Sequence, residues 1–321
     1  MDACSDPQIK QVVVMAGAQL GKSEALLNII GFHIEHDPSP ILLMQPTVEM
    51  AQSFSKDRIT SGLLNTTPSI RGKVKDPRAR DSGNTTLHKT FPGGAISLVG
   101  ANSPAGLASR PIRIVLCDEV DRYPLSAGEE GDPVALATKR AMTFWNRKIV
   151  LVSTPTDRGA SRIEAAYDES DKRKFYVPCP HCDEMQILKW ANVQWQSGEP
   201  STAQYYCECC GAAWSDVQRH KAVSLGEWRA TSEFAGVAGF HISALYSPWV
   251  LLPEAVDDFL KSKRDPMRLK TWVNTFLGET WEDQGEQVGA VWVSYWPSPY
   301  SPFGLSPPPG CPSTEASSLR A

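Results

Sequence analysis

Short apolar runs alternate with longer segments of helical periodicity through much of this chain. Each run is short enough to be a buried strand. Strands are predicted at residues 11–16, 41–44, 95–99, 112–117 and 148–152. Helices are predicted at residues 22–34, 47–59, 132–144, 253–264 and 266–277. Strands that alternate with helices predict an α/β fold with a mostly parallel sheet and helices on both of its faces.

The pattern changes near residue 173, where aromatic residues and cysteines become frequent. The predicted parts are a core at residues 1–172, an inserted module at 173–215, a completion of the core with linker helices at 216–287 and a tail at 288–321. From Ser294 the chain has seven Pro and seven Ser in 28 residues, so the tail is predicted to be disordered. Residues 62–84 are polar and basic, which fits either a solvated loop or a nucleic-acid contact.

Composition narrows the class of protein. The 321 residues are 41% hydrophobic and 21% charged, which is typical of a globular chain. A net charge of −4 argues against a strongly basic nucleic-acid module. The sequence has no run of eighteen apolar residues and no apolar stretch at its acidic N-terminus, so neither a membrane span nor a secretory signal is predicted.

A phosphate-binding turn is predicted where the first strand meets the first helix. Its sequence is Ala16-Gly17-Ala18-Gln19-Leu20-Gly21-Lys22-Ser23. Backbone N–H groups in such a loop point at phosphate oxygens. Lys22 is expected to reach the β- and γ-phosphates of ATP, and the Ser23 hydroxyl to ligate Mg²⁺. The alternative is a chance match, which the strand before the turn and the helix after it make less plausible.

Two more strand ends carry polar residues suited to the same chemistry. Asp118 and Glu119 close an apolar strand, and we expect Asp118 to hold Mg²⁺ and Glu119 to polarise the attacking water. Asp121 fits a helix cap or a loop charge better. Ser153 and Thr154 precede a proline at the end of the next strand, where small hydroxyls can sense the γ-phosphate. Exposed acids and an ordinary turn are the alternatives.

Two C-x-x-C pairs predict a metal module. The predicted ligands of one structural Zn²⁺ are Cys179, Cys182, Cys207 and Cys210. The pairs are separated by 24 residues, which matches a four-cysteine zinc ribbon. Four thiolates leave no open position for catalysis. His181 and Cys209 lie inside the pairs and are not counted as ligands, and free buried thiols are the alternative.

Taken together, these residues resemble the large terminase subunit of lambda-like tailed phages. The resemblance rests on the phosphate loop, Gln45-Pro46-Thr47, Cys117 to Pro124, Ser153 to Thr156, both cysteine pairs, and two later segments at 239–249 and 272–281. It implies a P-loop NTPase fold of the ASCE/RecA-like type and an ATPase motor that pumps DNA into a procapsid. The implied partners are double-stranded DNA, the small terminase subunit and the portal, with a ring oligomer in the bacterial host cytoplasm.

The chain departs from that family at both of its ends. The helical segment that usually precedes the phosphate-loop strand is nearly absent. A two-metal nuclease site needs several carboxylates, and Glu315 is the one acid after residue 287. The expectation is a chain truncated at both ends, as by a frameshift, without nuclease activity.

Two alternatives to a packaging ATPase stay open. One is a helicase-like nucleic-acid translocase, although the remaining residues are too few for a second RecA-like lobe. The other is a prophage remnant that binds nucleotide and DNA without productive turnover, because the loss of both ends could remove a partner's arginine. Candidates for an arginine of that kind are Arg58, Arg71 and Arg110.

Overall fold

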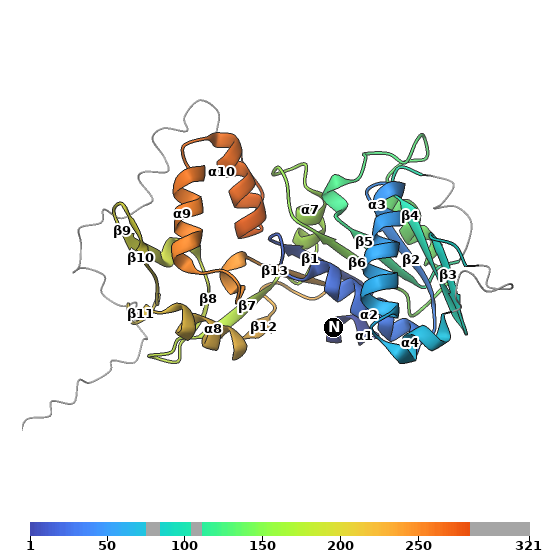
Figure 1. Cartoon of the computed structure of the whole chain (residues 1–321), viewed down its shortest axis with the longest axis horizontal. Coiled ribbons are helices and arrows are strands. Elements are labelled where there is room, and N and C mark those ends of the chain that lie inside the picture. Colours follow the sequence, from blue (N-terminus) through green and yellow to red (C-terminus); the bar gives the residue numbers. More distant parts are fainter. Residues whose placement is uncertain (75–83, 104–110, 283–321) are drawn as a thin grey trace, which may run out of the picture. The chain divides into compact units, whose positions relative to one another are not determined.

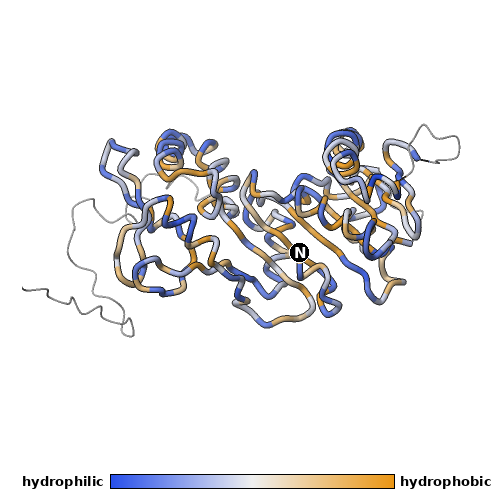
Figure 2. The backbone as a smooth tube through the Cα atoms, turned by 60° about the horizontal axis from the view of Figure 1, so that its bottom comes forward, coloured by the Kyte–Doolittle hydropathy of each residue, from blue (hydrophilic) through white to orange (hydrophobic). Residues whose placement is uncertain are grey.

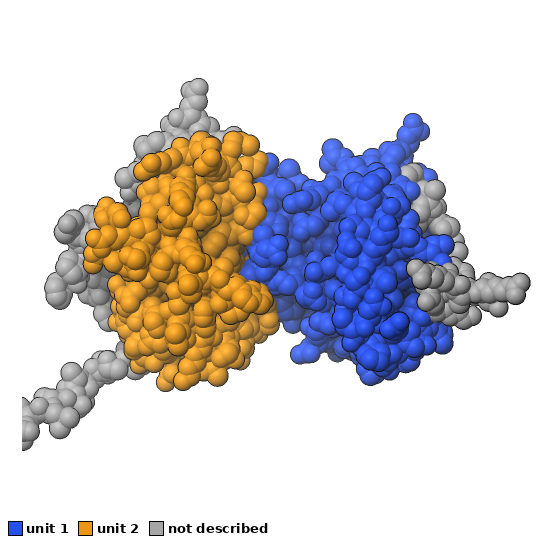
Figure 3. Space-filling view, viewed as in Figure 1, with its two compact units in different colours: residues 1–173, 230–241 blue, residues 174–229, 242–321 orange. Residues whose placement is uncertain are grey.

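The computed structural model describes residues 1–74, 84–103 and 111–282, which form two compact units (Figure 3). Unit 1 consists of Met1–Arg173 and Ala230–His241, so it is completed by a segment that follows most of unit 2 in the chain. Unit 2 consists of Lys174–Arg229 and the described residues from Ile242 onward. Each unit has its own apolar core.

Unit 1 is built on one sheet with the strand order β13-β1-β6-β5-β2-β4-β3 (Figure 1). In chain order the strands are β1 (Gln11–Ala16), β2 (Pro40–Gln45), β3 (His88–Phe91), β4 (Gly94–Gly100), β5 (Ile114–Asp118), β6 (Lys148–Ser153) and β13 (Val237–Ile242). Four neighbouring pairs are parallel: β1 with β6, β6 with β5, β5 with β2, and β2 with β4. The edge strand β3 pairs antiparallel with β4. The predicted mostly parallel sheet is therefore confirmed. The carboxyl ends of β1, β6, β5 and β2 lie at one edge of it.

Alternate residues of these strands enter two apolar clusters on opposite faces, because successive side chains of a strand point to opposite sides. In β2, for example, Ile41 and Leu43 belong to one cluster and Leu42 and Met44 to the other. Apolar positions concentrate along the central strands in Figure 2. Burial on both faces explains why the strands appear in the sequence as nearly continuous apolar runs.

Helices cover both faces, as predicted. In unit 1 they are α1 (Asp2–Ser5), α2 (Lys22–Glu35), α3 (Val48–Ser53), the π-helix η1 (Phe54–Leu64), α4 (Pro68–Lys73), the 3-10 turn η2 (Val120–Arg122), α6 (Pro133–Arg140) and α7 (Arg162–Asp168). The first cluster contains side chains of α2, α3, η1 and α4. The second contains side chains of α6 and α7.

Unit 2 contains two small antiparallel arrays and a group of helices. Its strands are β7 (Arg173–Pro178), β8 (Met185–Ile187), β9 (Val193–Gln196), β10 (Glu199–Tyr206), β11 (Ala213–Trp214) and β12 (Glu227–Arg229). Its helices are η3 (Trp190–Asn192), α8 (Asp216–Ser224), η4 (Ala244–Tyr246), α9 (Leu252–Ser262), α10 (Pro266–Trp272) and η5 (Val273–Leu277). Trp190, Tyr205 and Trp214 are buried in its core, so the aromatic residues that become frequent after residue 173 pack this unit.

The prediction that residues 62–84 form a loop is wrong in part. Residues up to Leu64 continue the π-helix, and Pro68–Lys73 form α4 because Pro68 suits a first helical turn and Ile70 is buried in the core. Residues 75–83, Arg110 and the tail at 288–321 lie outside the described residues. The strand β3 and the helix α7 were not predicted, since neither has a clear apolar period.

Candidate functional site: the carboxyl edge of the unit 1 sheet

The turn predicted to bind phosphate lies between the strand β1 and the helix α2. Ala16 is the last residue of β1, and Lys22 is the first residue of α2. Gln19 and Gly21 both have left-handed backbones, with φ of 57° and 82°. Glycine adopts that conformation without steric cost, which explains its place immediately before Lys22. The loop therefore wraps around the N-terminus of a 14-residue helix, where backbone N–H groups and the helix dipole favour an anion.

Lys22 joins the loop to the end of β6. Its ammonium donates to the carbonyl oxygen of Gly17 at 2.8 Å and to Thr154 Oγ1 at 2.9 Å. Lys22 is only 9% exposed, and this burial lowers its pKa, while the nearby carboxylates of Glu119 and Asp118 act in the opposite direction. A cation held here between carbonyl and hydroxyl oxygens can exchange these neutral partners for phosphate oxygens.

Asp118 has an unsatisfied acceptor at the end of β5. Gln45 Nε2, at the end of the adjacent β2, donates to Asp118 Oδ2 at 3.0 Å. The other oxygen, Oδ1, is buried and accepts no hydrogen bond among the described residues. Burial raises the pKa of this carboxyl, and the Gln45 contact opposes the rise. An orphaned, oriented carboxylate oxygen beside a lysine is a fitting ligand for Mg²⁺, which prefers oxygen and would stabilise the charged form.

Glu119 follows Asp118 in a strained conformation. Its φ of 55° is left-handed, which is uncommon for a residue other than glycine. Because the backbone turns at Glu119, the two adjacent side chains lie in different environments: the Asp118 carboxylate is buried and the Glu119 carboxylate is partly exposed. Glu119 is partly exposed, and its carboxylate lies 3.6 Å from Arg122 Nε. The arrangement leaves Glu119 accessible to water while Asp118 is buried.

Asp121 ties the ends of β5 and β6 to α7. One of its carboxylate oxygens accepts from both N and Oγ1 of Thr156 at 2.9 Å, and the other accepts from Ile163 N at 2.8 Å, in the first turn of α7. Its own N–H donates to Ser153 Oγ at 3.3 Å. Asp121 thus accepts from the first turn of α7, whose N-cap residue is Ser161, and it also links the segment after Glu119 to the segment after Thr154.

Replacing Asp121 with alanine is expected to destabilise the chain by about 2 kcal/mol, because three donors lose a shared charged acceptor. Urea unfolding followed by circular dichroism measures the change. Asp57→Ala is the matched control: that carboxylate is exposed, accepts from Ser53 on the surface of η1, and should cost less than about 0.5 kcal/mol. Equal stability of Asp121→Ala and the control would contradict the assigned role.

The four predicted cysteines come together in unit 2. Their Sγ atoms all lie within 4.8 Å of one another, with Cys179 to Cys210 and Cys182 to Cys207 each at 3.8 Å. A Zn–S bond of about 2.3 Å places the sulfurs of a tetrahedral site about 3.8 Å apart, so the cluster has the dimensions of a zinc site. Although burial alone raises the pKa of Cys207, backbone N–H donors and Gln186 outweigh it and lower that pKa to about 7. Burial raises the pKa values of Cys179 and Cys182, so the fit of the cluster to a soft divalent metal rests on the four-sulfur donor set and its spacing.

The structure brings some predicted residues into contact and leaves others apart. Lys22 meets Thr154, and the charges of Asp118 and Glu119 act on Lys22. In the described part of the chain, Ser23 makes no hydrogen bond to Asp118. Gln45 was missed as a site residue: a glutamine beside Pro46 looks like part of a turn. The available signal was a polar residue closing a buried strand.

These features define a mostly parallel α/β fold with a cation, carboxylates and a helix N-terminus at the carboxyl edge of its sheet, and comparison with known proteins adds the family. Residues 1–228 match the family described as phage terminase large subunit gpA, ATPase domain, so the chain belongs to that family. The resemblance inferred from the sequence is confirmed. Residues 237–295 match the family described as terminase large subunit gpA, endonuclease domain. The expected lack of nuclease activity rests on residues outside the described part and stays a prediction.

Two curated relatives are large terminase subunits. Those of Enterobacteria phage P21 and Escherichia phage lambda are each 29% identical to this chain, over 90% of it and 49% of their own length. The chain thus spans about half the length of these relatives. Among solved structures, the ATPase domain of the Thermus phage P74-26 large terminase has a TM-score of 0.49 at 15% identity, covering 84% of this chain and 88% of that one. Within the described residues, no helix has the length and apolarity needed to cross a membrane.

Proposed function

We propose that the chain is the ATP-hydrolysing motor part of a phage terminase that translocates double-stranded DNA into a procapsid. The observation that carries the proposal is the orphaned Asp118 Oδ1, buried at the same sheet edge as Lys22 and the N-terminus of α2. This edge combines a cation for phosphate, a free ligand for a metal and an accessible base. Membership of the terminase ATPase family supports ATP as the nucleotide.

Each side chain has a distinct task in the proposed reaction. Mg²⁺, held by Asp118 and Ser23 when bound, would neutralise charge on the phosphates. Lys22 attracts phosphate oxygens, and the loop N–H groups of Gly17 to Gly21 orient them. Glu119 accepts a proton from the attacking water. The buried carboxylate therefore serves the metal, and the exposed one serves the water.

The contact between Lys22 and Thr154 suggests how phosphate release reaches the rest of the unit. Loss of the γ-phosphate changes what Lys22 binds, and Thr154 is one of its partners. Ser153 then connects to Asp121, which holds the start of α7. We infer that Ser153 and Thr154 couple hydrolysis to movement, with DNA, the small terminase subunit and the portal as partners. A ring of subunits in the host cytoplasm and a structural Zn²⁺ held by the four cysteines of unit 2 complete the proposal.

Lys22→Ala is expected to lower kcat/KM for Mg-dependent ATP hydrolysis by about 100-fold or more, because one charged donor to the phosphates is lost. Phosphate release by the full chain, with and without linear double-stranded DNA, measures it. Lys56→Ala, which removes an exposed lysine on η1, is the control and should keep the rate.

The outcome also separates the alternatives. If the unmodified chain binds a labelled ATP analogue but shows no turnover with DNA present, the chain is a nucleotide-binding remnant. If Lys22→Ala hydrolyses ATP like the parent chain, the assigned site is wrong. Strand displacement by the isolated chain would instead support a helicase-like translocase.

A further inference from the structure

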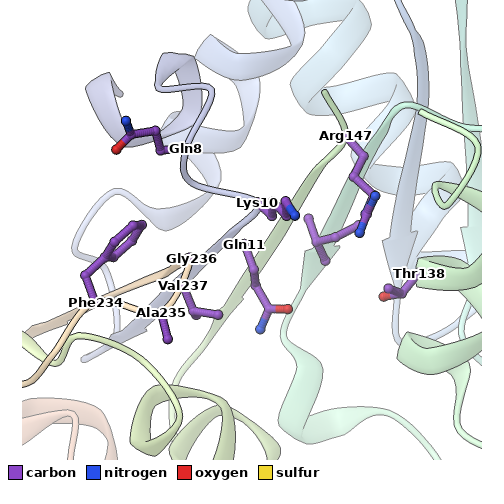
Figure 4. Close-up of a pocket in the computed structure, with 10 residues that line it drawn as sticks. Gln8, Lys10, Gln11, Thr138, Arg147, Phe234, Ala235, Gly236 and Val237 are labelled. Atoms are coloured by element: carbon purple, nitrogen blue, oxygen red, sulfur yellow. The ribbon is translucent and has the colours of Figure 1, made fainter. Parts of the chain in front are cut away.

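A cavity of about 410 Å³ lies at the opposite edge of the unit 1 sheet from the phosphate loop (Figure 4). It is lined at the amino ends of β1, β6 and β13, among others by Lys10, Gln11, Ile149 and Val237. Its size is in the range of ligand pockets. Because nucleotide binds at the carboxyl edge, the cavity has no role in the proposed reaction and can be occupied at the same time.

Two cations of the lining have no acidic partner. Among the described residues, the Lys10 side chain makes no ion pair, and the Arg147 guanidinium contacts the Phe144 carbonyl oxygen alone, at 3.3 Å. The lining residues include no carboxylate. Lys10 and Arg147 lie to the same side of Gly236 and Val237 in Figure 4. Two unneutralised cations on one wall form a site for anionic groups.

The rest of the lining is uncharged: besides Gly236, it contains the apolar residues Ile149, Phe234, Ala235 and Val237 and the polar residues Gln8, Gln11 and Thr138. Phe234 lies on the other side of Gly236 and Val237, and it is 41% exposed. The turn that carries Arg147 also carries Met142 and Trp145, which are 66% and 79% exposed. Phe234 thus places a large exposed apolar side chain in a lining that also carries two cations, a combination typical of a surface that another protein covers.

We propose that this cavity binds a peptide segment of a partner protein, in which acidic residues flank a large apolar side chain. The acids would pair with Lys10 and Arg147, and the apolar side chain would pack against Phe234 and Val237. Charge complementarity selects this occupant: a DNA backbone would need a longer row of cations and would leave the apolar wall unmatched. The proposal is independent of ATP hydrolysis.

The test uses the full chain and a fluorescein-labelled peptide, Glu-Asp-Trp-Leu-Asp-Glu, in an anisotropy titration. We expect binding at least about tenfold tighter than that of Lys-Lys-Trp-Leu-Lys-Lys or of an acidic peptide with Ser-Gly at the centre. The double variant K10E/R147E should reverse the preference between the acidic and basic peptides. A residue pair that only stabilises the fold would not produce this reversal.

Matched variants separate a specific site from general charge. K56E/K263E makes the same change of net charge on exposed lysines elsewhere and should keep acidic-peptide binding. Phe234→Ser should lower the affinity for the acidic, Trp-containing peptide by about tenfold. This variant tests the contribution of Phe234 even if the double variant fails to fold. Unchanged binding by K10E/R147E or by Phe234→Ser overturns the proposal. So does a short DNA duplex that binds more tightly than the peptide and is lost in K10E/R147E.

Discussion

Replacing Glu119 with glutamine is expected to lower kcat for ATP hydrolysis by about 100-fold or more while ATP binding is retained. The amide has nearly the same shape as the carboxylate but cannot accept the proton of the attacking water, and general-base catalysis is worth about 100- to 10,000-fold. Glu119 is partly exposed, and within the described residues its carboxylate pairs with the exposed Arg122, so the fold should tolerate the change. Phosphate release gives kcat, and equilibrium titration with a fluorescent ATP analogue gives the affinity.

The neighbouring acid provides a contrast to this result. Asp118→Asn should weaken the response to Mg²⁺ as well as turnover, because the orphaned oxygen that it alters is the proposed metal ligand. Glu130→Gln, which changes an exposed acid in the loop before α6, should leave both properties intact. A Glu119→Gln rate equal to that of the parent chain would show that another group takes the proton.

The second large effect is expected on removal of metal from the four-cysteine cluster. Zinc binding contributes about 10 kcal/mol or more to the folding of small four-ligand modules at neutral pH. One side of the cluster packs into the apolar core of unit 2, where Cys179 and Cys207 are buried, while Cys210 is exposed. Cys207→Ser, or treatment with a strong zinc chelator, should lower the Tm of unit 2 by more than about 10 °C.

Calorimetry and a colorimetric zinc assay measure these changes. Cys4→Ser is the matched control, because Cys4 lies outside the cluster in unit 1, and it should keep both the metal and the unfolding temperature. Acidification should release zinc as the thiolates take up protons, so metal-dependent stability is present at neutral pH and lost as the pH falls. A chain that contains no zinc as isolated, and unfolds as before after Cys207→Ser, would contradict a structural metal.

Local patterns were sufficient for the parts of the site that lie at strand ends. Lys22, Asp118 and Ser153 follow apolar runs that can only be buried strands, and parallel strands bring their ends to one edge. The contact of Gln45 with Asp118 depends on β2 lying beside β5, and no local signal gives that order. Asp121 reaches Ile163 across 42 positions of sequence, at the start of a helix with no clear apolar period.

Other features needed the tertiary structure because they combine distant segments. The cavity in Figure 4 is formed by residues near positions 10, 147 and 235, each unremarkable in its own stretch of sequence. The π-helix η1 continues α3, which begins at an ordinary N-cap, Thr47. No local sequence pattern indicates where the α-helix changes to a π-helix. The sequence indicated a new segment near residue 173 and a return to the core within residues 216–287, but it gave no signal that unit 1 contains residues 230–241 and that the described residues from Ile242 onward belong to unit 2.

The discontinuity of unit 1 has a consequence for how the chain is made. A ribosome finishes the four-cysteine module before it adds β13, whose neighbour in the sheet is β1. The backbone N–H of Lys10 donates to the Gly236 carbonyl, and that of Asp171 donates to the Val237 carbonyl. Two segments made early therefore gain these bonds only after residues 236 and 237 have been made. Until residue 241 has emerged, the edge of β1 has no strand beside it and is open to wrong pairing. Synthesis thus completes unit 1 after the four-cysteine module, and a fragment that ends at residue 173 would keep that exposed edge.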